Sequence, residues 1–316
     1  MNRWRVLITS PQLQRTIESH RSRLNESSIE VILPPVVQAL GEEELIALMP
    51  GIDGIVVGDD PLTGRVLEAA DQLRVISKWG VGIDNIDLRA AEEHHIRITN
   101  TPGAFGDDVA DVVVGYLVLL ARRLHQIDTK VRHGEWWKPE GVSLAGRRLG
   151  VIGLGDIGLG VARRATAMGM KVMGTEILAD RAGRAAAIGV ELVDLPSLLP
   201  AVDVLSLNCP LTADNRHMID NTALDALKPG AWIINTARGA LIKESALVTA
   251  LADGRVGAAA LDVFEEEPLP DTSRLRHFDN VILGSHNGSN TAEAVHRTSI
   301  RAIDNLLAGL LAAGSS

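Results

Sequence analysis

The fold is decided by one stretch, Leu149-Gly150-Val151-Ile152-Gly153-Leu154-Gly155-Asp156-Ile157-Gly158, in which a short apolar run leads directly into three glycines spaced GxGxxG. The apolar run predicts a strand, and the residues after it are patterned as an amphipathic helix. In such a turn the first glycine allows a sharp bend, the second lets the backbone approach a pyrophosphate, and the third lets the helix pack closely on the strand. The helix N-terminus then faces the phosphate charge. The stretch therefore predicts a dinucleotide-binding unit.

The next predicted strand, 171–175, is followed by an acidic residue that indicates which dinucleotide binds. Glu176 lies 18 residues after Gly158, where a carboxylate accepts hydrogen bonds from both ribose hydroxyls of NAD and repels a 2′-phosphate. The nearest arginine is Arg181, so we expect NAD rather than NADP. A tight turn without a ligand is the alternative. The expected phosphate-side contacts are Gly153, Gly155, Asp156, Ile157 and Gly158, although Asp156 adds a negative charge beside the phosphates.

Length and composition limit the class of protein. The chain has 316 residues, which suggests two domains of about 150 residues each. Its 46% hydrophobic and 22% charged residues are typical of globular proteins and exclude disordered, collagen-like and coiled-coil classes. The net charge is −9 and only 3% of residues are aromatic, so we expect no nucleic-acid partner.

Hydropathy and cysteine content limit the expected cellular location and the kinds of covalent or metal cross-link. The longest apolar run, 112–121, is too short to span a bilayer and fits a buried helix. The N-terminus lacks the apolar stretch of a signal peptide, so we expect a cytoplasmic protein with no membrane partner. The single cysteine, Cys209, excludes an internal disulfide and a cysteine-based zinc site, and we expect no metal.

Short runs rich in valine and isoleucine alternate with helical patterns along the chain. This rhythm predicts an α/β protein whose parallel sheets are covered by helices on both faces. Turn signals at 100–103, 134–139 and 287–290 are equally consistent with surface loops and with boundaries between domains. Expected helices include 107–134, 156–168, 243–252 and 292–313. The expected strands are 4–9, 30–33, 54–57, 75–78, 97–100, 148–152, 171–175, 202–207, 231–235, 258–263 and 281–284.

Polar side chains follow several strands after the glycine stretch, at the edge where ligands bind in open parallel sheets. Arg238 lies between two small residues, so its guanidinium suits either a substrate carboxylate or a surface ion pair. His286 follows the last strand and is either a general acid/base or a structural histidine. The acidic run 265–267 is either a solvated surface or contains a carboxylate that pairs with His286 and raises its pKa. Spacing alone leaves open which glutamate that is.

These features together resemble the D-isomer-specific 2-hydroxyacid dehydrogenases, and the resemblance covers nearly the whole chain. The family includes phosphoglycerate, glycerate, hydroxypyruvate and D-lactate dehydrogenases. The motifs that carry the resemblance are Ser77-Lys78-Trp79-Gly80-Val81-Gly82-Ile83-Asp84-Asn85-Ile86-Asp87, Asn100-Thr101-Pro102-Gly103-Ala104, residues 149–158, Cys209-Pro210-Leu211-Thr212, residues 235–242, residues 260–268 and Ser285-His286.

The resemblance implies a catalytic trio of Arg238, Glu267 and His286. Arg238 would bind and polarise a 2-oxo acid, His286 would protonate the carbonyl oxygen as hydride arrives from NADH, and Glu267 would orient His286. On the cofactor side it implies Asp262 at the nicotinamide carboxamide, with Thr236, Ala237, Cys209 and Pro210 nearby. On the substrate side it implies Val81 and Gly82, through their N–H groups, with Lys78 adding positive charge.

The resemblance also implies two Rossmann-like, doubly wound parallel-sheet domains with a cleft between them. Residues 1–100 and 287–316 would form a discontinuous substrate-binding domain, and residues 101–286 would form the NAD-binding domain. A homodimer through the cofactor domain is usual for the family, so Trp136-Trp137 are candidates for that interface.

The sequence leaves the substrate open among small 2-hydroxy and 2-oxo acids. Phosphoglycerate-specific relatives often carry arginine where this chain has Gly58-Asp59-Asp60, which would repel a phosphate, although Lys78 partly restores a cation. Asn287 and Phe105-Gly106 also depart from the commoner family residues. The alternatives are a 3-phosphoglycerate dehydrogenase, or a non-catalytic NAD(H)-sensing binding protein of the same fold. Formate is disfavoured as a substrate, because the resemblance implies that formate enzymes of the family replace the carboxylate that Glu267 supplies. Phosphite is a further candidate substrate, since enzymes of that branch also use arginine, glutamate and histidine.

Overall fold

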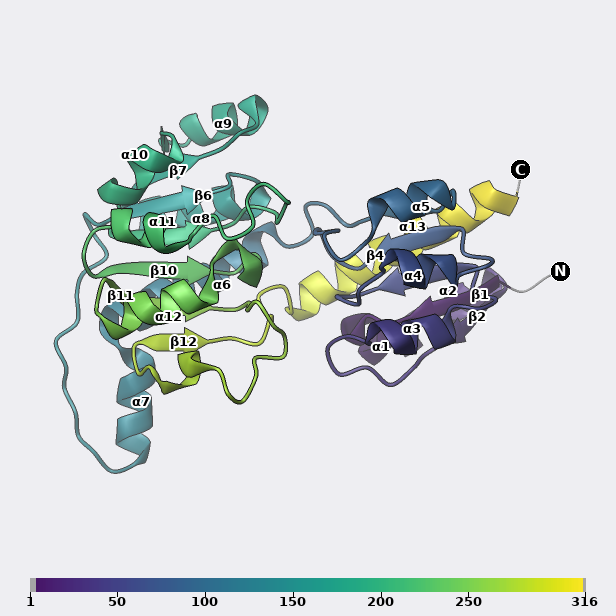
Figure 1. Ribbon diagram of the computed structural model, residues 1–316, viewed down its shortest axis with the longest axis horizontal. Helices are drawn as coiled ribbons and strands as arrows, with labels where there is room; N and C mark the ends of the chain where they lie inside the picture. The colour runs from purple at the N-terminus through teal and green to yellow at the C-terminus, as the bar shows by residue number, and fades with distance from the viewer. Residues whose placement is uncertain (1–3, 315–316) are drawn as a thin grey trace. The chain divides into compact units, whose positions relative to one another are not determined.

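The computed structural model describes residues 4–314, which divide into two compact units. The first consists of the described residues of Met1–Ala104 and Asn290–Ser316, and the second is Phe105–Ser289. Each unit is built on one parallel sheet covered by helices (Figure 1). The expected α/β class with two parallel sheets is confirmed. No helix within the described residues is long and apolar enough to cross a membrane.

The first unit has a five-stranded parallel sheet in the order β2-β1-β3-β4-β5. Alternate residues of the strands face opposite sides, so that Leu7, Ile55 and Ile76 share one core with helices α3, α4 and α5. The strands are β1 Trp4–Ile8, β2 Ile29–Ile32, β3 Gly54–Val57, β4 Val75–Lys78 and β5 Arg97–Thr99, and the helices are α1 Pro11–Thr16, α2 Arg21–Glu26, α3 Glu42–Leu48, α4 Gly64–Glu68, α5 Leu88–Glu93 and α13 Ala292–Gly314.

The C-terminal helix α13 belongs to this first unit because it packs directly on β3 and β4. A Cβ on Gly309 would lie 2.5 Å from Val75 Cγ2, so only glycine allows this approach. The hydroxyl of Ser77 donates to the carbonyl of Ala302 at 2.8 Å, and Trp79 Nε1 donates to Ser299 Oγ at 3.1 Å. The last stretch of the chain therefore covers a sheet formed by the first hundred residues.

The second unit has a seven-stranded parallel sheet in the order β12-β11-β10-β9-β6-β7-β8. Neighbouring residues of its central strands enter two separate cores, one on each face: Val204 and Ile234 face α6 and α8, whereas Leu205 and Ile233 face α11 and α12. The strands are β6 Arg148–Ile152, β7 Lys171–Thr175, β8 Glu191–Leu192, β9 Val204–Leu207, β10 Ala231–Asn235, β11 Val256–Leu261 and β12 Val281–Leu283. Strand β8 was not predicted, because its two residues are both exposed.

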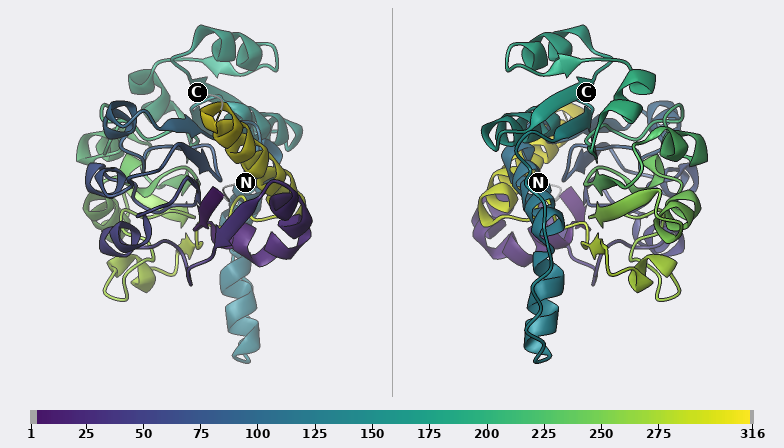
Figure 2. Two further views of the ribbon diagram at one scale, coloured as in Figure 1. Left: turned by 90° about the vertical axis from the view of Figure 1, so that its right-hand side faces the viewer. Right: turned by 90° about the vertical axis from the view of Figure 1, so that its left-hand side faces the viewer.

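One helix of the second unit differs from the sequence-based prediction. The expected single helix over 107–134 is wrong: α6 Gly106–Arg122 ends at Arg123, which has a left-handed φ of +52°, and α7 Leu124–Arg132 follows. Helix α6 buries one apolar face, whereas α7 buries none of its residues and extends away from the sheet (Figure 2). The other helices are α8 Asp156–Ala167, α9 Ala179–Ala186, α10 Leu195–Leu198, α11 Asn221–Ala226 and α12 Glu244–Ala252.

Candidate active site

The glycine turn between β6 and α8 has the geometry that its sequence predicts. Gly153 has a φ of +85°, and a Cβ there would lie 2.8 Å from the backbone of Cys209. A Cβ on Gly158 would lie 2.0 Å from the carbonyl oxygen of Gly153, so α8 packs as closely on the strand as glycine permits. Gly155 precedes the helix, with no backbone atom near the position of a Cβ. The turn therefore offers an open backbone surface at a helix N-terminus, which suits a pyrophosphate.

Glu176 lies immediately beside this turn and is fixed by the main chain. Its Oε2 accepts the N–H of Leu154 at 2.8 Å, and its Oε1 accepts the N–H groups of Ile177 and Leu178 at 2.9 and 3.0 Å. A carboxylate with two oxygens still has acceptor capacity for a ribose hydroxyl. The carboxylate is thus held at the turn before any ligand arrives.

Two arginines of α9 modify the charge around the turn. Arg184 lies 3.5 Å from the carboxylate of Asp156, so the negative charge that was unexpected beside the phosphates has a cationic partner. The guanidinium of Arg181 lies 3.6 Å from the Cβ position of Gly155. The sequence indicated that Arg181 is several residues from Glu176, whereas the fold brings its guanidinium next to the second glycine.

Unpaired polar atoms at the ends of neighbouring strands support a bound dinucleotide. Thr236 Oγ1 after β10 and Asn208 Oδ1 after β9 are buried, and neither has a hydrogen-bond partner within residues 4–314. Buried polar atoms are nearly always satisfied in native proteins, so these two indicate a ligand or water that supplies the partners. Cys209, next to Asn208, is partly buried, and burial raises the pKa of its thiol to about 11. Together with the glycine turn, these groups fit a nicotinamide dinucleotide.

His286 and Glu267 form a hydrogen-bonded pair. His286 Nδ1 lies 2.7 Å from Glu267 Oε2, and Glu267 Oε1 accepts the N–H of Phe264 at 2.9 Å. About a fifth of each side chain is exposed, at 23% and 22%. Of the three glutamates between 265 and 267, the one that pairs with His286 is therefore Glu267.

Asp262 holds the backbone that carries His286. The carbonyl of Asp262 accepts the N–H of His286 at 2.7 Å, and its carboxylate accepts the N–H groups of Asn287 and Gly288 at 3.2 and 2.8 Å. These bonds keep His286 in the left-handed conformation, with φ of +52°, that a histidine rarely adopts. Burial, followed by the charge of Asp262, raises the pKa of Tyr116, whose hydroxyl lies 3.5 Å from the same carboxylate. The carboxylate expected at the nicotinamide thus also positions the segment after β12.

Arg238 lies on a turn that Asn235 clamps. Asn235 Oδ1 accepts the N–H of Ala237 at 3.0 Å, and its Nδ2 donates to the carbonyl of Arg238 at 2.8 Å. The turn packs directly on the segment that leads to Glu267, because a Cβ on Gly239 would lie 1.8 Å from the carbonyl carbon of Phe264. The segments carrying Arg238 and Glu267 are therefore in main-chain contact.

In the first unit, Lys78 and Val81 are in contrasting environments. Lys78 is 2% exposed, and its ammonium contacts the carbonyl of Gly58 and lies 3.2 Å from Asp59 Oδ1. Val81 lies on an exposed turn, where its carbonyl accepts a bond from Asn100 Nδ2 at 2.7 Å, and Gly82 follows it. The ammonium expected to attract a substrate is thus buried and has an acidic neighbour.

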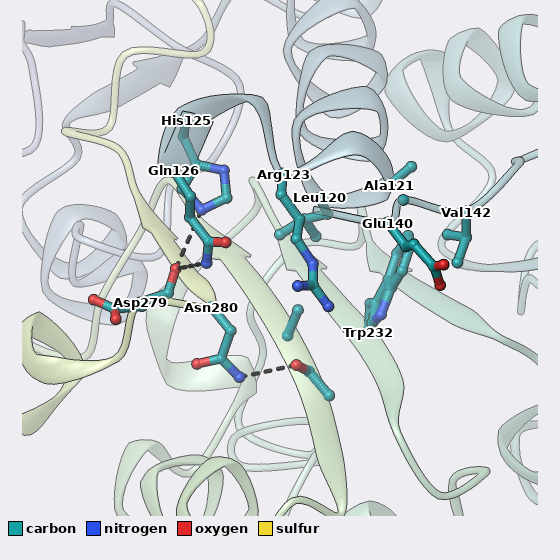
Figure 3. Close-up of a pocket in the computed structure, with 13 residues that line it drawn as sticks. Leu120, Ala121, Arg123, His125, Gln126, Glu140, Val142, Trp232, Asp279 and Asn280 are labelled. Atoms are coloured by element: carbon teal, nitrogen blue, oxygen red, sulfur yellow. Dashed lines mark hydrogen bonds between the residues drawn. The ribbon is translucent and has the colours of Figure 1, made fainter. Parts of the chain in front are cut away.

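A pocket of about 320 Å³ lies at the opposite, amino-terminal edge of the second sheet (Figure 3). It is lined by Arg123 and His125 at the junction of α6 and α7, by Trp232 of β10 and by Asn280 before β12. None of the residues expected to bind cofactor or substrate lines it. This pocket is therefore separate from the candidate site.

His217, which lies between β9 and α11, is a polar residue near the candidate site that the sequence did not predict. Its Nε2 is 2.5 Å from Glu265 Oε1, so a second histidine–glutamate pair accompanies the first. No sequence signal marked this residue, because histidines in loops are common and the contact joins residues 48 positions apart.

A glycine turn with an anchored acidic residue, together with a histidine–carboxylate pair and an arginine at strand ends, defines a nicotinamide-dependent oxidoreductase. The model of the D-isomer specific 2-hydroxyacid dehydrogenase NAD-binding domain matches residues 114–288. The chain is 38% identical over 311 residues to hydroxypyruvate reductase of Thermotoga maritima, covering 97% of this chain and 98% of that protein. It is 39% identical over 298 residues to D-3-phosphoglycerate dehydrogenase of Methanocaldococcus jannaschii, covering 92% of this chain and 54% of that one.

Solved structures agree with these sequence relatives. A protein of Thermus thermophilus has a TM-score of 0.84 and 35% identity, over 98% of this chain and 97% of that one. An NADPH-dependent glyoxylate/hydroxypyruvate reductase of Sinorhizobium meliloti, solved with NADP and malonate, has a TM-score of 0.83 and 32% identity, over 97% and 93% of the two chains. The chain belongs to the D-isomer specific 2-hydroxyacid dehydrogenase family. It is an NAD(P)-dependent oxidoreductase that acts on CH–OH groups.

Proposed function

We propose that this protein reduces small 2-oxo acids, glyoxylate and hydroxypyruvate foremost, to D-2-hydroxy acids with NADH. The observation that carries the proposal is the 2.7 Å bond between His286 and Glu267, in a chain 38% identical to a hydroxypyruvate reductase over nearly its full length. A general acid held by a carboxylate is what reduction of a carbonyl requires.

The proposed roles follow from the chemistry of each group. The bound nicotinamide supplies the hydride to C2. His286 donates a proton to the C2 oxygen from Nε2, because its Nδ1 is occupied by Glu267. Glu267 accepts the Nδ1–H bond, fixes the ring and stabilises its protonated form. In the direction of oxidation, His286 accepts the hydroxyl proton instead.

Arg238 is proposed to bind the substrate carboxylate through its planar fork and to polarise the C2 carbonyl. Val81 and Gly82 are proposed to contribute N–H groups to substrate binding, with Lys78 adding positive charge. Thr236, Ala237 and Asp262 are proposed to contact the nicotinamide. The unpaired hydroxyl of Thr236 and the carboxylate of Asp262 provide the polar atoms for that contact.

The environment of Lys78 favours substrates without a phosphate. Asp59 lies 3.2 Å from the ammonium and offsets its charge, and its side chain is 39% exposed. A phosphate beside Asp59 would be repelled. A 3-phosphoglycerate dehydrogenase is nevertheless the second candidate, since a protein of that name is 39% identical, although this chain spans only about half of its length.

An NADH-oxidation screen tests the proposal, using glyoxylate, hydroxypyruvate, pyruvate, phosphonopyruvate, sulfopyruvate and phosphohydroxypyruvate at equal concentrations. We expect the highest kcat/KM with glyoxylate or hydroxypyruvate. A higher value with phosphohydroxypyruvate would favour the second candidate. No oxidation with any of them, alongside normal NADH binding, would favour a non-catalytic NAD(H)-sensing protein.

Preference for NAD over NADP is proposed from Glu176. Its fixed carboxylate would repel a 2′-phosphate, whereas Arg181 beside Gly155 would attract one. We give Glu176 the greater weight because three N–H groups hold its carboxylate in place, while Arg181 is a long, partly exposed side chain.

A homodimer through the cofactor-binding unit is also proposed. Helix α7 buries no residue in its own chain, and Leu124, Val131 and Trp136 near it are exposed, Trp136 by 81%. A second copy would bury this apolar surface. Light scattering should give a mass of about two chains, and Trp136→Ser should shift the protein towards the monomer.

A further inference from the structure

His217 lies where three loops of the candidate site meet. Its backbone N–H donates to the carbonyl of Ala240 at 2.7 Å, two residues after Arg238. Ile219 pairs with Ile242 in a short parallel bridge just beyond. His217 itself has a left-handed φ of +56°, an unusual conformation for a histidine. The main chain around His217 is thus attached to the segment that follows β10.

The side chain of His217 reaches the segment that follows β11. Its Nε2 is buried and lies 2.5 Å from Glu265 Oε1, at ion-pair distance but outside hydrogen-bond alignment. About a third of each side chain is exposed, at 34% and 32%. Glu265 also donates its own N–H to the carboxylate of Glu244, which accepts the hydroxyl of Ser273 at 3.2 Å. Glu266 is a further carboxylate beside Glu244, so the His217 imidazole contacts, through Glu265, a group of three carboxylates.

On its other side, the segment of His217 is fixed to the loop that follows β9. Asn215 Nδ2 donates to the carbonyl of Pro210 at 2.8 Å, and Asn215 Oδ1 accepts the N–H of Thr212 at 2.8 Å. The N–H of Met218 donates to the carbonyl of Asn215 at 3.0 Å. The strands β9, β10 and β11 are neighbours in the sheet, so these contacts link three adjacent strand ends.

We propose that His217 is a positioning residue, which through its ion pair with Glu265 and its backbone bond to Ala240 sets the positions of Glu267 and Arg238 relative to each other. The inference rests on the proposed roles of these two residues. Glu265 precedes Glu267 by two residues, and Gly239 packs on Phe264–Glu265 without space for a side chain, so a shift of Glu265 moves both segments. Misplacement of a catalytic group by about 1 Å costs roughly 100-fold in rate.

The test compares His217→Gln with Glu266→Gln. The glutamine keeps a polar side chain but removes the imidazole that contacts Glu265, and Glu266 is an exposed neighbour whose change removes one carboxylate from the same loop. We expect His217→Gln to lower kcat about 10- to 100-fold, with the Kd of NADH unchanged within about twofold. Glu266→Gln should behave like the wild type.

A pH profile separates positioning from a general loss of structure. If His217 aligns Glu267, then His217→Gln weakens the bond that stabilises protonated His286, and the pH at which reduction falls to half its maximum moves lower. Glu265→Gln should produce the same shift, and the double variant should be no worse than either single one, because both remove one interaction. Three results would each overturn the inference: pH profiles of the variants that match the wild type, losses of kcat that add up in the double variant, or a loss of activity explained by weaker NADH binding.

The inference remains testable if the wild type reduces none of the 2-oxo acids. The titration of the His286 ring is then followed by NMR in the wild type and in His217→Gln. A lower midpoint in the variant supports positioning by His217 even where the proposed function has failed. An unchanged midpoint overturns it. If His217→Gln does not fold, Glu265→Gln is measured in its place.

Discussion

Both sheets carry charged side chains at the carboxyl ends of their strands, but the two units use these charges differently. In the first unit, Lys78 contacts Gly58 and Asp59, and the buried carboxylate of Asp60 accepts the hydroxyl of Thr9 at 2.5 Å. Burial raises the pKa of Asp60, although its hydrogen bonds oppose this shift. These groups satisfy one another within the unit, and Lys78 and Asp60 are almost completely buried.

In the second unit, the ends of β10, β11 and β12 carry Arg238, Glu267 and His286, which stay partly exposed. His286 is hydrogen-bonded to Glu267, and the hydroxyl of Thr236 at the end of β10 is buried without a hydrogen-bond partner among the described residues. The comparison shows that charged side chains at strand ends are buried within the protein in the first unit, whereas in the second unit they stay partly exposed, where a ligand can reach them.

The largest effect is expected from His286→Ala, which removes the proposed proton donor at the end of β12. Turnover should fall roughly 10²- to 10⁴-fold while the Kd of NADH is retained, because no proposed cofactor contact is lost. Steady-state kinetics and NADH fluorescence titration measure the two quantities. The exposed His277→Ala is the control, and wild-type turnover in His286→Ala would contradict the assignment.

Arg238→Lys keeps the positive charge at position 238 but removes the planar guanidinium group. We expect kcat/KM for glyoxylate to fall about 100-fold or more, because an ammonium does not bind a carboxylate through two parallel bonds. The change is measured by initial rates across substrate concentration. Retention of more than half of the wild-type kcat/KM would show that bidentate binding is not used.

The reactivity of Cys209, which lies beside the glycine turn, tests the effect of burial on the pKa of its thiol. With its pKa raised to about 11 by burial, the thiol is protonated at pH 8, and iodoacetamide should react about 100-fold more slowly than with an ordinary cysteine. The rate should rise as the pH approaches 11. The unfolded chain ionises this thiol at lower pH than the folded one, so its contribution to stability falls as the pH rises from about 9 to 11. Rapid labelling of the folded protein at pH 8 would contradict this.

Glu176→Ala should lower the ratio of kcat/KM with NADH to that with NADPH about 10-fold, corresponding to about 1.4 kcal/mol. The reason is the loss of the carboxylate that is proposed to bind the ribose hydroxyls and to repel a 2′-phosphate. Arg181→Ala is the matched variant and should raise the same ratio. A wild-type enzyme that prefers NADPH would refute the role given to Glu176.

The smallest effect is expected from Lys78→Met, which removes a charge that is already paired within the first unit. Methionine fills a similar volume, and Asp59 is exposed enough to be hydrated, so the free energy of unfolding should change by about 1 kcal/mol or less. The KM for glyoxylate should rise only a few-fold. Chemical denaturation and steady-state kinetics measure these quantities. If Lys78→Met lowered kcat/KM as much as Arg238→Lys, the strand-end charges of the two units would not differ in their role.

Sequence by itself determined the α/β class, every strand of the two sheets except β8, and the turn at 153–158. These are local properties: β-branched runs, helical periodicity and glycines whose backbone conformation excludes other residues. It also identified Glu176, Arg238 and His286 as candidates, because a strand end is recognisable from the chain alone. Glu267 was named only by the resemblance to the family, since spacing left all three glutamates of the run 265–267 open. It failed at Arg123, where an amphipathic pattern continues although the backbone turns.

The tertiary structure decided which of these side chains meet. It paired His286 with Glu267 and His217 with Glu265, brought Arg181 beside Gly155, and buried Lys78 against Asp59. It also joined the last helix to the first sheet through Gly309 and Val75. The physical reason is that hydrogen bonds and ion pairs act over a few ångströms, whereas these partners are separated along the chain by between 19 and more than 230 residues. Only the packing of the strands sets those distances.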